Sequence, residues 1–176
     1  MGLSVVSMIR ISQQKGLHNY KQLIVVARSI FLLAILIEIV FAIMFVALHS
    51  TLPYLFLNME NQNQLLDNKE VIEIASKLLL VAAVFQISDG IQVVVLGALR
   101  GLQDVKVPMY ITFVAYWVIG FPISYYLGEH TPLKAEGVWI GLLAGLTAAA
   151  VFLYIRFHYL TKKMVKQGEP KENIDY

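Results

Sequence analysis

The stretch LLLVAAVFQISDGIQVVVLGAL, residues Leu78–Leu99, decides the fold class of this chain. It is almost wholly apolar, and a bilayer core about 30 Å thick needs roughly 20 apolar residues in a helix to cross it. The segments 24–48, 107–127 and 137–160 have the same character. Helices satisfy their backbone hydrogen bonds internally, so they are the form in which such segments cross a membrane. The sequence therefore predicts an all-α integral membrane protein with four spans.

The composition excludes several other classes of protein. Of the 176 residues, 58% are hydrophobic and only 15% are charged, whereas soluble domains carry about 25% charged residues. The chain has no cysteine, so it can form neither disulfides nor thiolate metal sites. Its four histidines share no ligand spacing, and its net charge is only +2. We therefore expect no cofactor, no metal site built from histidine or cysteine, and no nucleic-acid partner.

The domain organisation follows from the spans. We expect residues 1–20 to be the end of a helix and a cytoplasmic turn, residues 21–160 to be the four-helix membrane region, and residues 161–176 to be a polar cytoplasmic tail. Lysine and arginine collect on the cytoplasmic side of membrane helices. The two termini and the loop between the second and third spans hold 11 of the 14 basic residues: Arg10, Lys15, Lys21, Arg28, Arg100, Lys106, Arg156, Lys162, Lys163, Lys166 and Lys171. This bias predicts that both termini are cytoplasmic.

An acid interrupts the apolar stretch that decides the fold. Asp89 lies halfway along it, and Gln86, Ser88 and Gln92 are within one helical turn. A carboxylate at the middle of a membrane costs about 2.5–3.5 kcal/mol on insertion scales, and such residues commonly mark ion or proton pathways. We therefore predict that Asp89 couples to a cation, Na⁺ or H⁺, and that the three polar neighbours supply oxygen ligands. Glu38, in the first span, has no polar neighbour in sequence, and its role stays open between a lipid-edge and an inter-helix position.

The loop after the second span has the features of a tight turn. Arg100 and Asp104 are spaced for an interaction at the helix end, and Gly101 is expected to cap the helix with a positive φ. Pro108 then lies where the third span begins, at a position that needs no backbone N–H. We predict that these four residues fix the turn between two helices and contact no substrate.

Two further patterns concern the packing of the third and fourth spans. Gly120 and Pro122, in the sequence IGFP, lie inside the third span and are expected to kink it. Gly137, Gly141 and Gly145 fall on one face of the fourth span, and small residues at this spacing allow two helices to approach closely. We interpret this stripe as a packing surface.

The stretch FQISDGIQVVVLGALRGLQDVKVPMYITFVAYWVIGFPISYYL (85–127) resembles the multidrug and toxic compound extrusion (MATE) family, in its NorM-type bacterial branch. In that family a spanning helix ends in an A-L-R-G-like turn, a short loop with Asp follows, and a Pro opens the next helix. The sequence IRISQQKG (9–16) is similar to the turn that ends the family's eighth helix, and GVWIGLLAGLTAAAV (137–151) is similar to its twelfth.

This resemblance implies a fold and an activity. The family has twelve helices in two lobes, so the chain would hold the end of helix eight and the last four helices. Its members exchange cationic drugs and dyes for inward-moving Na⁺ or H⁺ across the bacterial inner membrane. An acid on helix ten takes part in coupling, and Asp89 occupies that position. The partner glutamate on helix seven and the whole N-terminal lobe are not in this sequence, which implies that the chain is inactive without them.

Two alternatives belong to other classes. The residues SDGIQVVVLGALRGLQD are superficially similar to the motif of a CDP-alcohol phosphotransferase. That chemistry needs Ala-Arg shortly after Asp-Gly and more aspartates than Asp89 and Asp104 provide, so we predict that the chain is not an enzyme. The second alternative, a free-standing four-helix protein that forms homo-oligomers through the glycine stripe, stays open.

Overall fold

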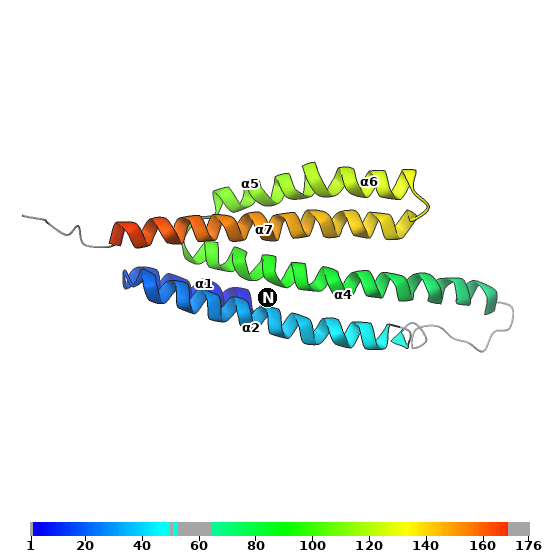
Figure 1. Ribbon diagram of the computed structural model, residues 1–176, viewed down its shortest axis with the longest axis horizontal. Coiled ribbons are helices and arrows are strands. Elements are labelled where there is room, and N and C mark those ends of the chain that lie inside the picture. The colour runs from blue at the N-terminus through cyan, green and yellow to red at the C-terminus, as the bar shows by residue number, and fades with distance from the viewer. Residues whose placement is uncertain (1, 50, 53–64, 169–176) are drawn as a thin grey trace, which may run out of the picture.

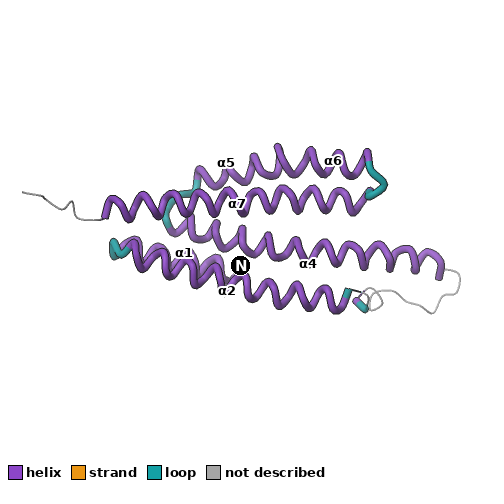
Figure 2. Tube along the Cα trace, in the orientation of Figure 1, coloured by secondary structure: helices purple, strands orange, loops and turns teal. Residues whose placement is uncertain are grey.

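The computed structural model describes residues 2–49, 51–52 and 65–168, and Figure 2 shows that this part of the chain is helical except for short turns. The elements, in chain order, are α1 (Gly2–Gly16), α2 (Tyr20–Leu48), α4 (Leu65–Gly101), α5 (Lys106–Val114), the π-helix η2 (Ala115–Gly120), α6 (Phe121–His130) and α7 (Lys134–Gly168). Because α5, η2 and α6 follow one another without a break, they form one rod.

Within the described residues, four helical rods are long and apolar enough to cross a membrane. They cover Tyr20–Leu48, Val71–Gly101, Lys106–His130 and Lys134–Gln167. Each predicted span lies inside one of them, and the described residues contain no strand. The predicted all-α fold with four spans is therefore confirmed.

The rods lie side by side with α4 and α7 in the middle (Figure 1). Helix α4 packs against α1 and α2 on one side and against α7 on the other. Helix α7 in turn packs against the rod of α5, η2 and α6. Since α4 has neighbours on both sides, its residues can take part in contacts with three different helices.

Helix α1 is a short helix that precedes the first span in the sequence. Its 15 residues extend about 22 Å, at 1.5 Å per residue, which is less than a bilayer core. A turn then reverses the chain: His18 takes a positive φ of 53°, and the side chain of Asn19 accepts a hydrogen bond from the backbone N–H of Gln22 at 3.1 Å. This cap allows α2 to begin at Tyr20 and to run antiparallel beside α1.

The main core lies near this turn, where α1, α2, α4 and α7 meet. Its buried members are Ile11, Leu23, Ala27, Val95, Ala98, Leu99, Leu102, Leu153 and Phe157. The outer face of α2, in contrast, is apolar and exposed: Leu32, Leu36 and Val40 are 62%, 61% and 65% exposed. A face this apolar is unfavourable in water, which fits contact with lipid.

The helix that carries the fourth predicted span is longer than that span. Helix α7 continues beyond Leu160 to Gly168, because Thr161 is buried and Met164 packs against the core cluster. These contacts hold residues that the sequence assigned to a polar tail. The rest of that tail, residues 169–176, lies outside the described residues.

Candidate functional site

The predicted coupling acid lines an open cleft between three helices. The cleft has a volume of approximately 430 Å³. Its lining residues are Gly2, Leu3 and Ser4 of α1, Ile37 and Glu38 of α2, and Asp89, Gly90, Val93 and Val94 of α4. Asp89 is exposed on this chain. The two acids are the only side chains of charged type among the lining residues, so the cleft holds two acidic groups and no basic one.

Glu38 enters the cleft from α2 and lies over the backbone of α4. A Cβ atom built on Gly90 would be 2.5 Å from both Cγ and Oε1 of Glu38. Such distances are impossible for real atoms, so the side chain of Glu38 occupies space that only a glycine at position 90 leaves free. The structure thus answers the open question about the position of Glu38: it lies between helices, against Gly90 of α4.

The spacing of buried residues along α2 indicates the inter-helix position of Glu38, although its neighbours in sequence do not. The buried residues that face inward from the first half of α2 are Leu23, Ala27, Ile30 and Ala34. Residues four positions apart lie on one face of a helix, and Glu38 follows Ala34 by four. Helical phase therefore directs Glu38 toward α4 rather than toward lipid.

The polar neighbours of Asp89 do not all point toward it. The hydroxyl groups of Ser88 and Thr147 of α7 are 3.1 Å apart, and the Tyr116 hydroxyl of η2 donates a hydrogen bond to Gln92 Oε1 at 2.8 Å. Ser88 and Gln92 are four residues apart, so they share a face that is turned toward α7 and η2. Gln86 is half-buried and is not among the lining residues of the cleft. Glu38 and Asp89 are therefore the two side chains that offer carboxylate oxygens there.

Helix α1 closes one wall of the cleft through a tight contact with α4. The Ser4 hydroxyl donates to the carbonyl oxygen of Val93 at 2.9 Å. A Cβ on Gly97 would be 2.6 Å from the hydroxyl oxygen of Ser4 and would overlap its carbonyl oxygen. The glycine thus allows the two backbones to touch and fixes the position of the cleft wall.

The loop after α4 forms a turn, but by other contacts than the sequence predicted. The left-handed residue is Gln103, with φ 63°, and Gly101 has no positive φ. Gly101 is needed for a different reason: a Cβ there would be 2.6 Å from the carbonyl oxygen of Met8, so the glycine makes room for α1. Pro108 is buried in the first turn of α5.

Two cations from distant helices hold this loop in place. Asp104 accepts a hydrogen bond from Arg156 Nε of α7 at 2.8 Å, whereas Arg100 is exposed and forms no ion pair within the described residues. The expected interaction between Arg100 and Asp104 is thus replaced by one with α7. Lys15 donates to the carbonyl oxygen of Leu102 at 2.8 Å, which satisfies an acceptor that the end of α4 leaves open.

The glycine stripe of α7 lies against η2 and α6. A Cβ on Gly137 would be 2.6 Å from the carbonyl oxygen of Leu127, and one on Gly141 would overlap the backbone of Ser124. A Cβ on Gly145 would be 2.9 Å from the Cα of Gly120. The stripe is therefore buried inside this chain, which removes the surface on which the homo-oligomer alternative depended.

The rod that faces this stripe changes its helical winding at the predicted kink. The π-helix η2 ends at Gly120, and the backbone N–H of Phe121 bonds to Tyr116, five residues back. Pro122 follows in the first turn of α6. Local π turns are one of the ways in which a membrane-spanning helix tolerates a proline.

A model of the MatE family matches residues 1–126. This chain belongs to the MATE family. Members of this family are transporters and not enzymes, so the prediction that the chain is no enzyme is confirmed. With its four apolar rods, it is a multi-pass membrane protein.

Within the described residues, no three His, Cys, Asp or Glu side chains come together as a metal site would require.

Several relatives support this assignment. A probable multidrug resistance protein NorM of Agrobacterium fabrum is 34% identical over 166 residues, which are 94% of this chain and 35% of that protein. The corresponding protein of Bacillus cereus is 42% identical over 133 residues, 76% of this chain and 29% of its own length. This MATE chain thus spans about a third or less of these relatives.

Solved structures agree with the fold. The eukaryotic MATE transporter AtDTX14 matches 95% of this chain and 36% of its own, with a TM-score of 0.75 and 17% identity. An inward-facing multidrug resistance MATE family transporter of the MOP superfamily matches 96% of this chain and 37% of its own, with a TM-score of 0.80 and 18% identity. The helices of this chain therefore have the arrangement found in part of a complete MATE transporter.

Proposed function

We propose that this chain is the C-terminal part of a secondary antiporter that exports cationic drugs or other xenobiotics in exchange for Na⁺ or H⁺. Family membership and relatives named as multidrug resistance proteins support the transported class. The observation that carries the coupling role is the position of Asp89, an acid on a membrane-spanning helix that borders an open cleft without a basic partner. Intramembrane acids of this kind serve as ion and proton sites.

The part of the longer relatives that this sequence does not cover is expected to form a second structural unit, which moves against this one. Secondary transporters place the substrate between structural repeats and rock one repeat against the other. Asp89 is exposed on this chain, as a residue at the boundary between two lobes would be. An N-terminal lobe, supplied by the upstream two-thirds of a complete transporter, would cover this face and contribute the second half of the substrate cavity. The chain is then inactive by itself.

The test of this function is export of a cationic dye from membrane vesicles under an imposed Na⁺ or H⁺ gradient. The protein used is a complete transporter that carries residues 1–176 as its C-terminal part, with Asp89→Asn as the decisive variant. Export driven by either gradient supports the antiport mechanism, and the gradient that drives it identifies the coupling ion. Export that depends on neither gradient would contradict it.

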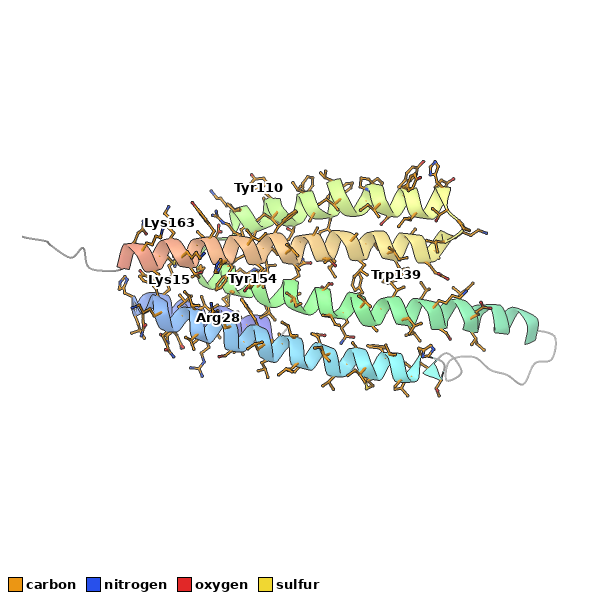
Figure 3. All side chains as sticks on the ribbon, in the orientation of Figure 1. Lys15, Arg28, Tyr110, Trp139, Tyr154 and Lys163 are labelled. Carbon is orange, nitrogen blue, oxygen red and sulfur yellow. The ribbon has the colours of Figure 1, made fainter. Side chains whose placement is uncertain are left out.

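The orientation we propose has both termini in the cytoplasm of a bacterial inner membrane. Figure 3 supports it, because Lys15, Arg28 and Lys163 lie toward the same end of the molecule, where α1 ends and α2 begins, away from Trp139 near the start of α7. Basic residues favour the cytoplasmic side.

Cysteine labelling tests this orientation without background, since the chain has no cysteine of its own. We expect Leu133→Cys, between α6 and α7, to react with a membrane-impermeant thiol reagent added to intact cells. Lys106→Cys, at the start of α5, should react only after the cells are permeabilised. Reaction of Lys106→Cys in intact cells, with Leu133→Cys protected, would show the reverse orientation.

A further inference from the structure

We propose that the exposed face where α5 begins and α7 ends binds the headgroup of an anionic phospholipid. We call this surface the basic patch; it consists of Lys106 and Tyr110 of α5 and of Tyr159, Lys163 and Lys166 of α7. Its occupant is a lipid of the leaflet that borders this end of the molecule. The proposal requires only that the chain is embedded in a membrane, so it is independent of the antiport mechanism and of the coupling ion.

The last turns of α7 have two faces of different chemistry. Phe157 and Thr161, four residues apart, are buried and belong to the face that packs against the other helices. Tyr159, Lys163 and Lys166 follow a second line along the helix, at spacings of four and three residues, and all three are exposed. Residues at these spacings share one face of a helix. The basic face is therefore turned away from the protein, where α7 leaves its apolar stretch.

Helix α5 contributes the other half of the patch. Figure 1 shows that α7 extends beyond the start of α5 at this end of the molecule, and the two helices pack against each other. Lys106 opens α5, and both it and Tyr110 are exposed. Figure 3 shows Tyr110 and Lys163 on the same outer edge. The 2.8 Å ion pair from Arg156 of α7 to Asp104, just before α5, holds the two parts of the patch together.

The positive charge of the patch is complementary to an anionic headgroup. None of the ion pairs within the described residues includes Lys106, Lys163 or Lys166. Asp104, the carboxylate in the loop before α5, is already paired with Arg156. At the edge of a bilayer, the phosphate of an anionic phospholipid supplies the opposite charge, and each Lys or Arg near such a surface strengthens association roughly fivefold.

An aromatic face leads from the patch into the membrane, which favours a lipid over a soluble anion. Tyr110, Phe113 and Trp117 are exposed on the same rod, and the rings of Phe113 and Trp117 stack with centroids 6.1 Å apart. Trp117 lies eleven residues beyond Lys106, which is about 16 Å along a helix. One leaflet of a bilayer core is about 15 Å deep. Tyrosine is common at the headgroup level, so this face can contact a lipid from headgroup to chain end.

The test measures lipid binding to the purified 176-residue chain by native mass spectrometry. The chain is titrated with phosphatidylglycerol, which is anionic, or with zwitterionic phosphatidylcholine of the same acyl chains. We expect phosphatidylglycerol to occupy a first site at the lower concentration. The combined variant Lys106→Gln, Lys163→Gln and Lys166→Gln should raise its dissociation constant by about a hundredfold, from roughly fivefold for each lysine. Binding of phosphatidylcholine should stay unchanged.

A matched control separates the basic patch from the overall charge of this end of the molecule. The combined variant Arg10→Gln, Lys21→Gln and Arg100→Gln removes the same charge from exposed positions on α1, α2 and the end of α4. It should leave the first phosphatidylglycerol site at the wild-type affinity. An equal loss of affinity in both combined variants would show that diffuse charge attracts the lipid, and it would overturn the proposal.

A soluble competitor distinguishes a lipid site from a phosphate site. Glycerol phosphate carries the headgroup phosphate without acyl chains, so it should not displace phosphatidylglycerol at concentrations at which the lipid itself saturates the site. Displacement at those concentrations, or equal affinity of the wild-type chain for the two lipids, overturns the proposal. If the combined lysine variant does not fold, Lys163→Gln decides: a dissociation constant raised about fivefold supports the patch, and an unchanged one rejects it.

Discussion

Asp89→Asn should reduce ion-driven export to the background rate while the amount of transporter in the membrane stays at the wild-type level. Asparagine preserves the shape of the side chain, but it can neither exchange a proton nor supply a negative charge to a cation. Asp89 makes no hydrogen bond or ion pair within the described residues that its replacement would break, and it is exposed on this chain. Function should therefore be lost without a loss of folding.

The measurement is dye export from vesicles under a Na⁺ or H⁺ gradient, with the amount of protein determined in the same membranes. Glu73→Gln is the matched control, because Glu73 is an exposed acid on the same helix, with 70% of its side-chain surface accessible and Lys77 as its partner at 2.9 Å. This control should export at the wild-type rate. Wild-type export by Asp89→Asn would reduce Asp89 to a structural acid.

Gly141→Val should have the largest effect on stability, because it separates α7 from α6. A Cβ at this position overlaps the backbone nitrogen and Cα of Ser124, and neither backbone atom can move without shifting its helix. The same shift breaks the hydrogen bond from the Ser124 hydroxyl to the carbonyl oxygen of Val138, which measures 3.0 Å. Overpacking of a well-packed contact costs about 1–3 kcal/mol and occasionally more.

Thermal unfolding of the purified transporter in detergent measures this effect. We expect a lower melting temperature and less folded protein for Gly141→Val, and a smaller change for Gly141→Ala. Gly2→Val adds the same side chain where no atom lies within 4 Å, so it should melt as the wild type does. A Gly141→Val protein with an unchanged melting temperature would show that the close approach of α6 and α7 does not stabilise the fold.

The sequence predicted the spans well because their cause is local. The hydrophobic length of a segment determines whether it can cross a bilayer, and all four segments lie inside the observed rods. The helix that carries the last predicted span continues beyond Leu160, and hydropathy does not report that Thr161 is buried and that Met164 packs against the core cluster. Tertiary contacts extended the helix beyond the apolar stretch.

The site could be predicted only in part, because its contacts join residues that are far apart in the sequence. Asp89 was conspicuous as a charge in an apolar run. The pairing of Asp104 with Arg156 spans 52 positions, and no spacing rule connects them. The same limit applied to Ser88 and Gln92, whose nearness to Asp89 in sequence did not show that they face α7 and η2.

The position of Glu38 follows from the helical spacing of the buried residues in α2, which composition does not report. Its neighbours in sequence are apolar, so composition left its role open between a lipid-edge and an inter-helix position. The inward-facing alanines of α2 placed it on the α4 side, and Gly90 supplied the space that it fills. A glycine on one span can thus make room for an acidic side chain on the next, as Gly90 does for Glu38.

Reconstitution in vesicles tests directly whether this chain is one of the two lobes of an antiporter. Residues 1–176 are purified and reconstituted in vesicles, beside the same chain joined to the N-terminal two-thirds of a MATE transporter, and a Na⁺ or H⁺ gradient is imposed on both. We expect the chain by itself to insert and move no cationic dye, and the joined protein to export it. Gradient-driven dye movement by the 176-residue chain, abolished by Asp89→Asn, would contradict this account and favour a working homo-oligomer.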